Sequence, residues 1–255
     1  MADNRQRLWA RVEYDGTDFY GFQIQAHGRT VQGEIERALK SLTGMETPVV
    51  GAGRTDRGVH ARGQVIAFEV EWKHDLVDLQ RALNAVLAAD VVVLEMEPAA
   101  EGFHPRFSAT CRSYRYTILN RPWRSPGARR FAWHVAEPLE VGDMGRSSRC
   151  LVGTHDFATF GRPLRGENTV RTVFRAEWQQ ERPWLTFDIE ADAFLYRMVR
   201  SIVGTLVLVG RGKMSVDEFE GLLQARDRSL IRQVAPAHGL CLMRVDYAMR
   251  GGVVQ

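Results

Sequence analysis

Apolar side chains first recur with a period of two, over residues 7–14, which read RLWARVEY. The alternating apolar positions are Leu8, Ala10, Val12 and Tyr14. Because successive side chains of a strand point to opposite faces, this period predicts a β-strand with one buried face.

The pattern then changes to a helical period. Residues 30–44 read TVQGEIERALKSLTG, with apolar positions three and four apart and a terminal glycine, so we expect a helix that stops at Gly44. The same reasoning predicts a strand over 47–52, a strand over 65–71, a helix over 76–87 and a strand over 91–96. The resulting order, β-α-β-β-α-β, is the ferredoxin-like unit.

The second half repeats this plan with one helix inserted before the last strand. Its expected elements are a strand over 109–119, a helix over 139–152 that two glycines weaken, a hairpin of 170–179 and 184–190 around Arg182–Pro183, a helix over 195–206, a helix opened by the capping box of Ser215 and Glu218, and a strand over 239–247.

The expected fold class is therefore α+β, with two ferredoxin-like βαββαβ halves, mainly antiparallel sheets and helices packed on one face. We place the N-terminal half at 1–105 and the C-terminal half at 106–255. The connections 98–108 and 121–130 are the expected linkers, and the second, RPWRSPGARR, is basic.

Composition narrows the class of protein only slightly. The 255 residues are 45% hydrophobic and 25% charged, as in ordinary globular proteins, and the formal net charge of +3 permits a polyanionic partner. The three cysteines lie far apart and form no CxxC pair, so we expect a reducing cytosol and no structural metal. Neither the N-terminal residues nor the longest apolar run, near 202–209, predicts a signal peptide or a membrane span.

One short stretch has unusual chemistry. Residues 51–65 read GAGRTDRGVHARGQV, where Asp56 is the only acid among Arg54, Arg57 and Arg62. The stretch lies between two expected strands, and its glycines would let a ligand approach the backbone. From these features alone, an Asx-turn is the more common role for such an aspartate.

The arginines favour a second interpretation, because they would stabilise an ionised carboxylate and attract an anionic ligand. A lone aspartate among cations is a poor metal site, the GKS/T of a phosphate-binding P-loop is missing, and a glycosidase would need a second carboxylate. What remains is one acid that acts as nucleophile or base, with arginines that bind a phosphodiester backbone.

Residues 53–60, GRTDRGVH, resemble the signature of the TruA family of tRNA pseudouridine synthases. Further blocks resemble that family in the same order along nearly the whole chain: YDGTDFYGFQIQ (14–25), TVQGEIERAL (30–39), LNAVLAADVVV (83–93), FHPRFSATCRSYRYTI (103–118), GTHDFATF (153–160), AFLYRMVRSIVGTLVLVGRGK (193–213) and GLCLMRVDY (239–247). Phe22 and Ala88 stand where the family commonly has Trp and Pro, outside the catalytic block.

The resemblance implies the pseudouridine synthase fold, with an active-site cleft between the halves. It also implies the isomerisation of uridine to pseudouridine in the anticodon stem-loop of tRNA, at positions 38, 39 and 40, without cofactor or metal. By resemblance Asp56 is the nucleophile, which attacks the sugar C1′ or removes a proton from C2′. Arg54 resembles the arginine that pairs with this aspartate and helps to hold the flipped nucleotide.

Two residues of the second half join the expected site. Tyr114, in SYRYT, resembles the substrate-binding tyrosine of the family, although the strand pattern alone would make Tyr114 and Tyr116 core aromatics. Arg200, in RMVRS, resembles an active-site basic residue, with an exposed helix charge as the alternative.

Other residues stay open between two roles. Arg57 and Arg62 are candidates for phosphate contacts or exposed charges, and His60 for a supporting hydrogen bond or a structural role in the loop. The basic loop 121–130, which includes Trp123, is either a tRNA contact or a solvated loop. His155 and Asp156, at an expected helix end, favour structural roles.

The resemblance further implies tRNA as the partner, a homodimer and a cytoplasmic protein without membrane contact. Two other classes compete with this prediction. A non-catalytic RNA-binding protein gives no reason for an acid inside an arginine-rich loop, and the RNP aromatic signature is missing. A metal-dependent nuclease or phosphatase would need a carboxylate or histidine cluster, which the sequence does not suggest.

Overall fold

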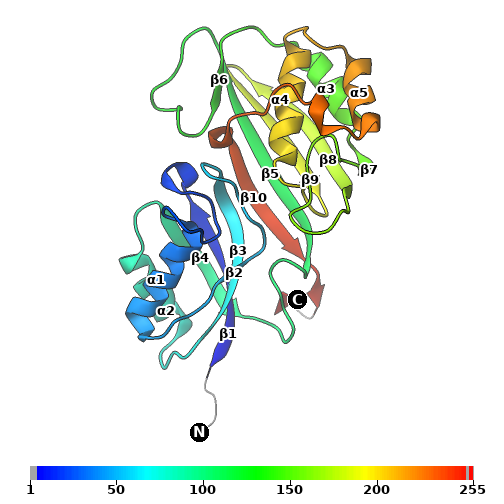
Figure 1. Ribbon diagram of the computed structural model, residues 1–255. Helices are drawn as coiled ribbons and strands as arrows, with labels where there is room; N and C mark the ends of the chain where they lie inside the picture. Colours follow the sequence, from blue (N-terminus) through cyan, green and yellow to red (C-terminus); the bar gives the residue numbers. More distant parts are fainter. Residues whose placement is uncertain (1–4, 251–252, 255) are drawn as a thin grey trace. The chain divides into compact units, whose positions relative to one another are not determined.

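The computed structural model describes residues 5–250 and 253–254. They form two compact units, coloured along the chain in Figure 1. The first unit comprises Met1–Thr110 together with Leu242–Gln255, and the second comprises Cys111–Cys241. Each combines mainly antiparallel strands with helices, which confirms the predicted α+β class.

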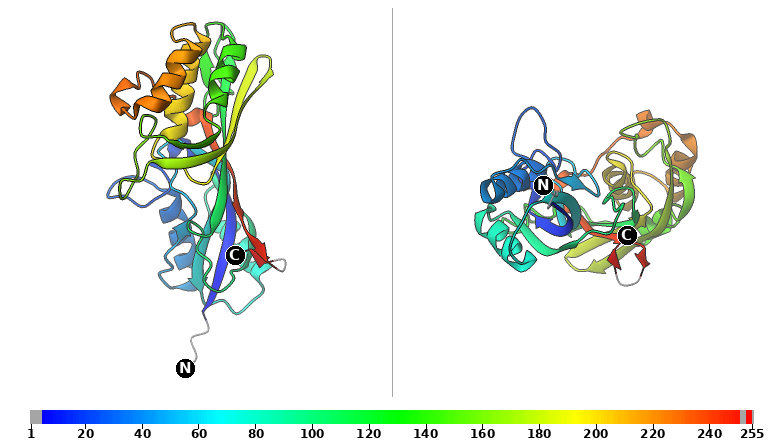
Figure 2. Two further views of the ribbon diagram at one scale, coloured as in Figure 1. Left: turned by 90° about the vertical axis from the view of Figure 1, so that its right-hand side faces the viewer. Right: turned by 90° about the horizontal axis from the view of Figure 1, so that it is seen from below.

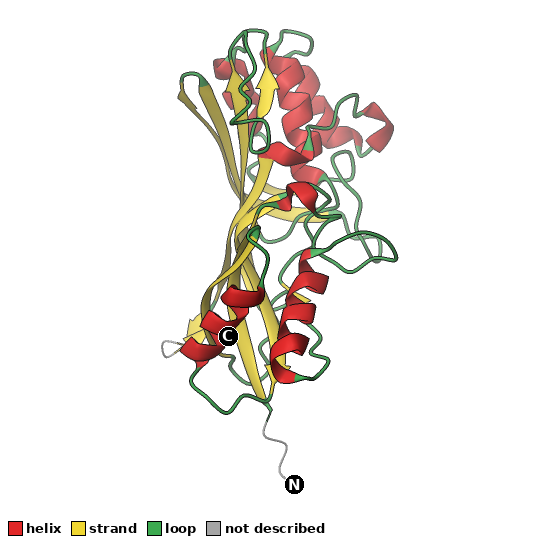
Figure 3. Ribbon diagram, turned by 90° about the vertical axis from the view of Figure 1, so that its left-hand side faces the viewer, coloured by secondary structure: helices red, strands yellow, loops and turns green. Residues whose placement is uncertain are grey.

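The first unit has the predicted order β-α-β-β-α-β. Its elements are β1 (Gln6–Tyr14), α1 (Val31–Thr43), β2 (Val50–Gly51), β3 (His60–Val70), α2 (Leu76–Val86) and β4 (Val91–Pro98). β1 pairs antiparallel with both β3 and β4, so it lies between them. Helices α1 and α2 contact each other and lie in front of these strands in Figure 3.

The two periods seen in the sequence build the core of this unit. Leu8, Ala10 and Val12 are completely buried, as the period of two predicts for β1. α1 begins where the Thr30 hydroxyl accepts a hydrogen bond from the amide three residues later, and it ends at Gly44, whose φ of +73° is left-handed.

The strands around the glycine-rich motif differ from the prediction. β2 covers only two residues of the longer strand expected there, and β3 begins at His60 instead of at residue 65. β3 pairs with β1 as far as Ala61, which lies opposite Tyr14. The first residues of β3 are mostly polar or glycine, so they show no apolar period. They pair with β1 all the same, because backbone hydrogen bonds need no apolar side chain. The end of the motif is therefore strand, whereas Asp56 stays on the connection.

The second unit contains the predicted hairpin and the three predicted helices. Its elements are β5 (Ala109–Asn120), β6 (Trp133–Val135), α3 (Val141–Arg149), β7 (Gly153–Asp156), β8 (Val170–Glu181), β9 (Trp184–Ala191), α4 (Met198–Gly210) and α5 (Val216–Ala225). The strand order is β5-β9-β8-β7, with antiparallel neighbours, and β6 runs parallel to β5. The three helices contact one another and lie together on one side of these strands (Figure 2).

In this unit, the structure confirms one local prediction and corrects another. Ser215 and Glu218 form the predicted capping box at the start of α5. The placement of His155 and Asp156 at a helix end is wrong: α3 already ends at Arg149, and both residues lie in β7. β6 and β7 were not predicted, because three or four residues are too few to reveal a period.

The compact units differ from the predicted halves 1–105 and 106–255 mainly in the unit to which the last strand belongs. β10 (Leu240–Tyr247) lies beside β3, so the chain from Leu242 onward belongs to the first unit. Element order alone does not show to which sheet a closing strand returns. The remaining elements are the 3-10 helices η1 (Gly16–Asp18), η2 (Arg228–Leu230) and η3 (Ala237–Gly239) and the strand pair β11 (Met249–Arg250) and β12 (Val253–Val254).

None of the helices formed by the described residues is both long and apolar enough to cross a membrane.

Candidate active site

Asp56 lies on the turn between β2 and β3, in the first unit. The turn closes where the Val59 amide donates a hydrogen bond to the Asp56 carbonyl oxygen at 3.1 Å, and Gly58 supplies a φ of +79°. Thr55 and Val59 are buried on either side, while Asp56 is half-buried. The buried neighbours anchor the turn, and the aspartate between them keeps part of its surface exposed.

Hydrogen bonds fix the backbone at the start of this turn. The hydroxyls of Tyr14 and Thr55 lie 2.7 Å apart in a buried hydrogen bond. The Thr55 carbonyl oxygen accepts from the Phe22 amide at 3.1 Å. The Gly53 carbonyl oxygen accepts from the Gln64 side chain at 2.9 Å. Buried polar groups are costly to leave unpaired, so these contacts resist movement of the turn.

The three arginines of the motif have different surroundings. Arg54 and Asp56 lie two residues apart on the same loop, so the structure keeps the predicted pair in one unit. Arg54 and Arg62 are exposed. The guanidinium of Arg57 lies over the ring of Tyr20, 4.1 Å from its centroid, in a cation–π contact. The loop therefore presents positive charge around a single carboxylate.

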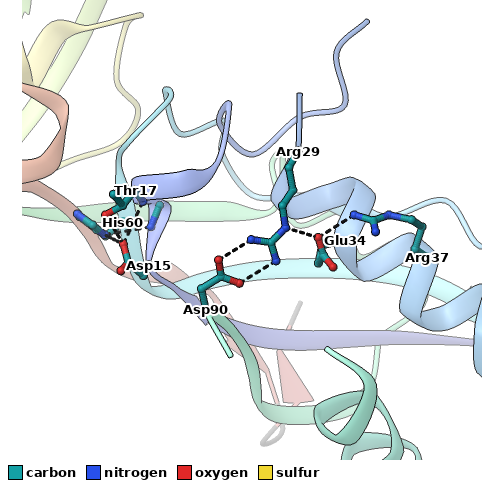
Figure 4. Close-up of polar contacts among 8 residues, drawn as sticks. Asp15, Thr17, Arg29, Glu34, Arg37, His60 and Asp90 are labelled. Carbon is teal, nitrogen blue, oxygen red and sulfur yellow. Dashed lines mark hydrogen bonds and ion pairs between the residues drawn. The ribbon is translucent and has the colours of Figure 1, made fainter. Parts of the chain in front are cut away.

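His60 is buried at the start of β3 and makes polar contacts with partners that the sequence did not identify. Its Nδ1 accepts a hydrogen bond from the Gly16 amide at 3.0 Å and lies 3.2 Å from an Asp15 carboxylate oxygen (Figure 4). The same carboxylate accepts from the amide and the hydroxyl of Thr17, at 3.0 and 2.6 Å. His60 thus links the motif to the segment that follows β1.

Tyr114 lies on β5, in the second unit, and is half-buried. It stands opposite Ile189 of β9, and its ring meets Phe194 edge-on, with centroids 5.1 Å apart. Tyr116 shares this face, as predicted, but it is completely buried and donates a hydrogen bond to the Pro236 carbonyl oxygen at 2.8 Å. The core interpretation therefore suits Tyr116, whereas Tyr114 keeps an accessible part.

Burial also affects the acidity of the Tyr116 phenol. Desolvation raises the pKa of Tyr116 well above its usual value, although the positive charge of Arg200 acts in the opposite direction. Tyr116 therefore stays neutral and serves the core.

Arg200 lies in the first turn of α4 and is half-buried. Its Nε donates to the Ala235 carbonyl oxygen at 2.8 Å, and the Ala235 amide donates back to the Arg200 carbonyl oxygen at 2.9 Å. One turn later, a Cβ on Gly204 would lie 2.3 Å from the Gln233 carbonyl oxygen, so α4 packs directly on the backbone of this segment. Arg200 is thus a fixed side chain and not a solvated helix charge.

The predicted site residues therefore divide between the units: Arg54 and Asp56 in the first, Tyr114 and Arg200 in the second. Within the described part of the chain, no group of three or more His, Cys, Asp or Glu side chains is arranged to hold a metal ion.

Comparison with known proteins identifies the family. A family model described as tRNA pseudouridine synthase matches residues 10–108 and 148–248. The tRNA pseudouridine synthase A of Moorella thermoacetica is 46% identical over 241 residues, which cover 92% of this chain and 97% of the relative. That of Thermoanaerobacter sp. strain X514 is 41% identical over 237 residues, with the same coverages. The chain therefore belongs to the tRNA pseudouridine synthase family, and it is an isomerase.

This result confirms the resemblance drawn from the sequence blocks and, with the α+β architecture, the pseudouridine synthase fold. Among solved structures, a Cbf5–Nop10–Gar1 complex matches with a TM-score of 0.38 and 12% identity, covering 92% of this chain and 58% of that chain. A likeness at this level supports no further conclusion.

Proposed function

We propose that this protein isomerises uridine to pseudouridine in the anticodon stem-loop of tRNA, at positions 38, 39 and 40, with Asp56 as the nucleophile. The observation that carries the proposal is the fixed turn of the GRTDRGVH motif. It presents one half-buried carboxylate between buried anchors and beside exposed arginines. That arrangement suits an acid that must meet a sugar inside a polyanionic substrate.

The chemistry needs no external reactant. The N-glycosidic bond breaks, the uracil turns, C5 bonds to C1′, the proton of C5 leaves, and N1 gains a proton, so atoms and electrons balance within the nucleotide. A carboxylate can attack C1′ or remove a proton from C2′, and either route passes through positive charge on the sugar. Asp56 is suited to both routes. Arg54 would pair with Asp56 and support the flipped nucleotide, whose unstacking costs a few kcal/mol.

Tyr114 and Arg200 are proposed as substrate-binding residues of the second unit. The part of Tyr114 that remains exposed can stack on the uracil, and its hydroxyl is a candidate acceptor for the C5 proton. Arg200, fixed by two hydrogen bonds with Ala235, offers a positive charge in a defined place. These contacts support the roles that the family resemblance implies for both residues.

The basic loop 121–130 is a proposed tRNA contact. The Arg121 side chain donates to the Trp123 carbonyl oxygen at 2.9 Å, and His134 hydrogen-bonds the Arg121 carbonyl oxygen at 2.8 Å. Trp123 is 82% exposed on this loop, which is unusual for so large an apolar side chain. An indole among arginines can stack on an unpaired base while the arginines contact phosphates.

We also propose that the protein works in the cytoplasm as a homodimer. The family resemblance supports both proposals. The size of the substrate supports the homodimer, because one chain of 28.9 kDa has limited surface for an L-shaped tRNA.

The test is pseudouridine mapping of tRNA before and after incubation with the protein in EDTA, with Asp56→Asn in parallel. The substitution keeps the size of the side chain and removes the nucleophile and its charge. We expect modification at positions 38–40 by the parent protein, none by Asp56→Asn, and unchanged or slightly tighter tRNA binding by the variant. More than a trace of product from Asp56→Asn in a single-turnover assay would remove this residue from the catalytic role.

A further inference from the structure

Residues 15–30, here named the bracing segment, connect β1 to α1 and have no role in the chemistry proposed above. Both ends of the segment are fixed. The Asp15 amide donates to the Asp90 carbonyl oxygen at 3.0 Å, and the Arg29 guanidinium binds both Asp90 carboxylate oxygens, at 2.5 and 2.8 Å (Figure 4). Glu34 also accepts from Arg29, at 2.6 Å. Bidentate pairs set orientation as well as distance, so the segment is tied to the starts of β4 and α1.

The middle of the bracing segment lies directly against the backbone around Asp56. Gly21 has a φ of +105°, and a Cβ placed on it would lie 2.8 Å from the Thr55 carbonyl oxygen and 3.3 Å from the Arg57 amide nitrogen. The next residue, Phe22, donates its amide hydrogen to the same Thr55 oxygen at 3.1 Å. Only glycine permits both this conformation and this approach.

A second contact lies on the other side of Asp56. A Cβ on Gly16 would lie 2.0 Å from the Val59 carbonyl oxygen, so the two backbones touch there as well. The Gly16 amide also donates to His60 Nδ1 at 3.0 Å. The bracing segment therefore contacts the turn before and after the aspartate, and on each side a glycine allows the close approach of the two backbones.

We propose that the bracing segment is a positioning element for the chemical step, which holds the peptide of Asp56 so that its carboxylate meets the sugar in one orientation. The inference rests on the proposed role of Asp56 as nucleophile. Contacts between backbones contain no flexible side chain that can yield, so they transmit rigidity directly to the turn. A displacement of about 1 Å at a reacting group can cost about 10²-fold in rate.

Affinity for tRNA should respond differently, because it depends mainly on surface cations and their phosphate partners. Gly16, Gly21 and His60 supply none of these contacts: His60 is buried, and the two glycines have no side chain. Loss of the bracing contacts should therefore lower turnover far more than binding.

The first test is Gly21→Ala, measured as a single-turnover rate of pseudouridine formation and as a dissociation constant for tRNA. The added Cβ would press on the Thr55 carbonyl oxygen and force the turn to move. We expect the rate to fall by about 10- to 100-fold, with the dissociation constant within about twofold of the parent value. A folded Gly21→Ala protein with the parent rate would overturn the proposal, and so would equal losses of rate and affinity.

Gly44→Ala is the matched control. Gly44 also has a left-handed φ, of +73°, but a Cβ on it would meet nothing within 4 Å. It ends α1 in the same unit, so the control places a side chain on a second positive-φ glycine without contact to the motif. We expect Gly44→Ala to keep the parent rate, and a loss equal to that of Gly21→Ala would mean that backbone strain alone explains both.

A second pair of variants tests the hydrogen bond between the Gly16 amide and His60 without adding a side chain to a glycine. This pair tests the positioning role even if Gly21→Ala does not fold. His60→Leu removes the acceptor for the Gly16 amide, whereas His60→Asn can place a carbonyl oxygen near the position of Nδ1. We expect a slow Leu variant and a largely restored Asn variant, both with parent tRNA affinity. Equal rates of the two, whether fast or slow, would contradict a positioning role for this hydrogen bond.

Asp56→Asn, assayed beside these variants, separates this inference from the proposed function. An active Asp56→Asn protein would overturn the nucleophile assignment whatever the glycine variants do. An inactive Asp56→Asn protein beside a fully active Gly21→Ala protein would overturn only the bracing role.

Discussion

Tyr114 and Tyr116 show how two residues of one type, on one face of one strand, can serve different purposes. Tyr116 is completely buried, and its hydroxyl donates a hydrogen bond to the Pro236 carbonyl oxygen. Tyr114 stands opposite Ile189 at a position where part of its surface remains exposed. A ring must be accessible on some part to stack on a base, so only Tyr114 is a substrate-binding candidate.

Tyr114→Phe and Tyr114→Ala separate the ring from the hydroxyl. Phenylalanine keeps the ring, so we expect tRNA binding near the parent value, but a rate lower by about 10²-fold or more if the hydroxyl accepts the C5 proton. Alanine also loses the stacking contact, worth about 1–3 kcal/mol of binding. Filter binding and single-turnover assays measure both effects. Parent-like turnover by Tyr114→Phe would leave Tyr114 as a stacking platform only.

Tyr116→Phe is the internal control for this prediction. It leaves the Pro236 carbonyl oxygen without its hydrogen bond, which should lower the free energy of unfolding by about 1–3 kcal/mol. Below the unfolding transition, we expect its single-turnover rate to match that of the parent protein.

At the scale of single residues, the sequence predicts placement better than contact. The position of Asp56 on a connection follows from the strand patterns around it, and the shared face of Tyr114 and Tyr116 follows from their spacing. The hydrogen bond between Gly16 and His60 does not follow from any local pattern, because it joins residues 44 positions apart. In the sequence, Gly16 and Gly21 cannot be told from ordinary turn glycines, because their contacts with the motif form only in the folded chain.

Among the elements, α4 illustrates how a helix can position a proposed site residue, Arg200, through close packing. Gly204 lies one turn after Arg200, and a Cβ on it would lie 2.3 Å from the Gln233 carbonyl oxygen and 2.9 Å from the Ala235 nitrogen. Because Arg200 is hydrogen-bonded to Ala235 twice, the same segment that touches Gly204 also holds the arginine.

Gly204→Ala should therefore affect both stability and activity. The added methyl group meets backbone atoms that cannot rotate away, so we expect the free energy of unfolding to fall by about 1–3 kcal/mol. The displaced segment should also weaken the support of Arg200 and slow turnover. Urea unfolding and single-turnover assays measure the two effects.

Gly221→Ala in α5 is the matched helical control. A Cβ there would meet nothing within 4 Å, so the change should stabilise the helix by about 0.5–1 kcal/mol. Equal behaviour of Gly204→Ala and Gly221→Ala would show that packing at Gly204 does not matter.

The basic loop 121–130 allows a separate prediction about binding. Trp123→Ala should raise the dissociation constant for tRNA by about 5- to 150-fold, equivalent to the loss of about 1–3 kcal/mol of stacking. Trp123→Phe keeps an aromatic face and should retain most of the affinity. Filter binding at one fixed salt concentration measures both, because phosphate contacts make affinity strongly salt-dependent. An alanine variant that binds like the parent would identify the loop as solvated surface.

Elements were predictable where the sequence carries a long period or a cap. α1 and α5 have side-chain caps, and the strands β1 and β9 show a period of two in their apolar residues. β2, β6 and β7 have four residues or fewer, too few for a period to appear. The early start of β3 depends on pairing with β1, which is a tertiary interaction.

At the scale of the whole molecule, the alternation of strands and helices was enough to predict the α+β class, because each amphipathic element must bury one face. It was not enough to assign the last strand. β10 follows the helices of the second unit in sequence, yet its residues from Leu242 onward belong to the first. Only the pairing of β10 beside β3 reveals this return.

The proposed homodimer predicts a mass in light scattering of twice the 28.9 kDa chain at micromolar concentration. A mass near that of one chain would contradict it. A sharper test asks whether one subunit binds the tRNA that its partner modifies. Co-expressed Asp56→Asn and Trp123→Ala chains would form some mixed dimers, in which an intact basic loop and an intact Asp56 lie on different subunits. If the two functions work across the dimer, the mixture should modify tRNA faster than either variant alone. If each subunit serves itself, every intact aspartate remains on a chain with a weakened loop, and mixing should give no gain.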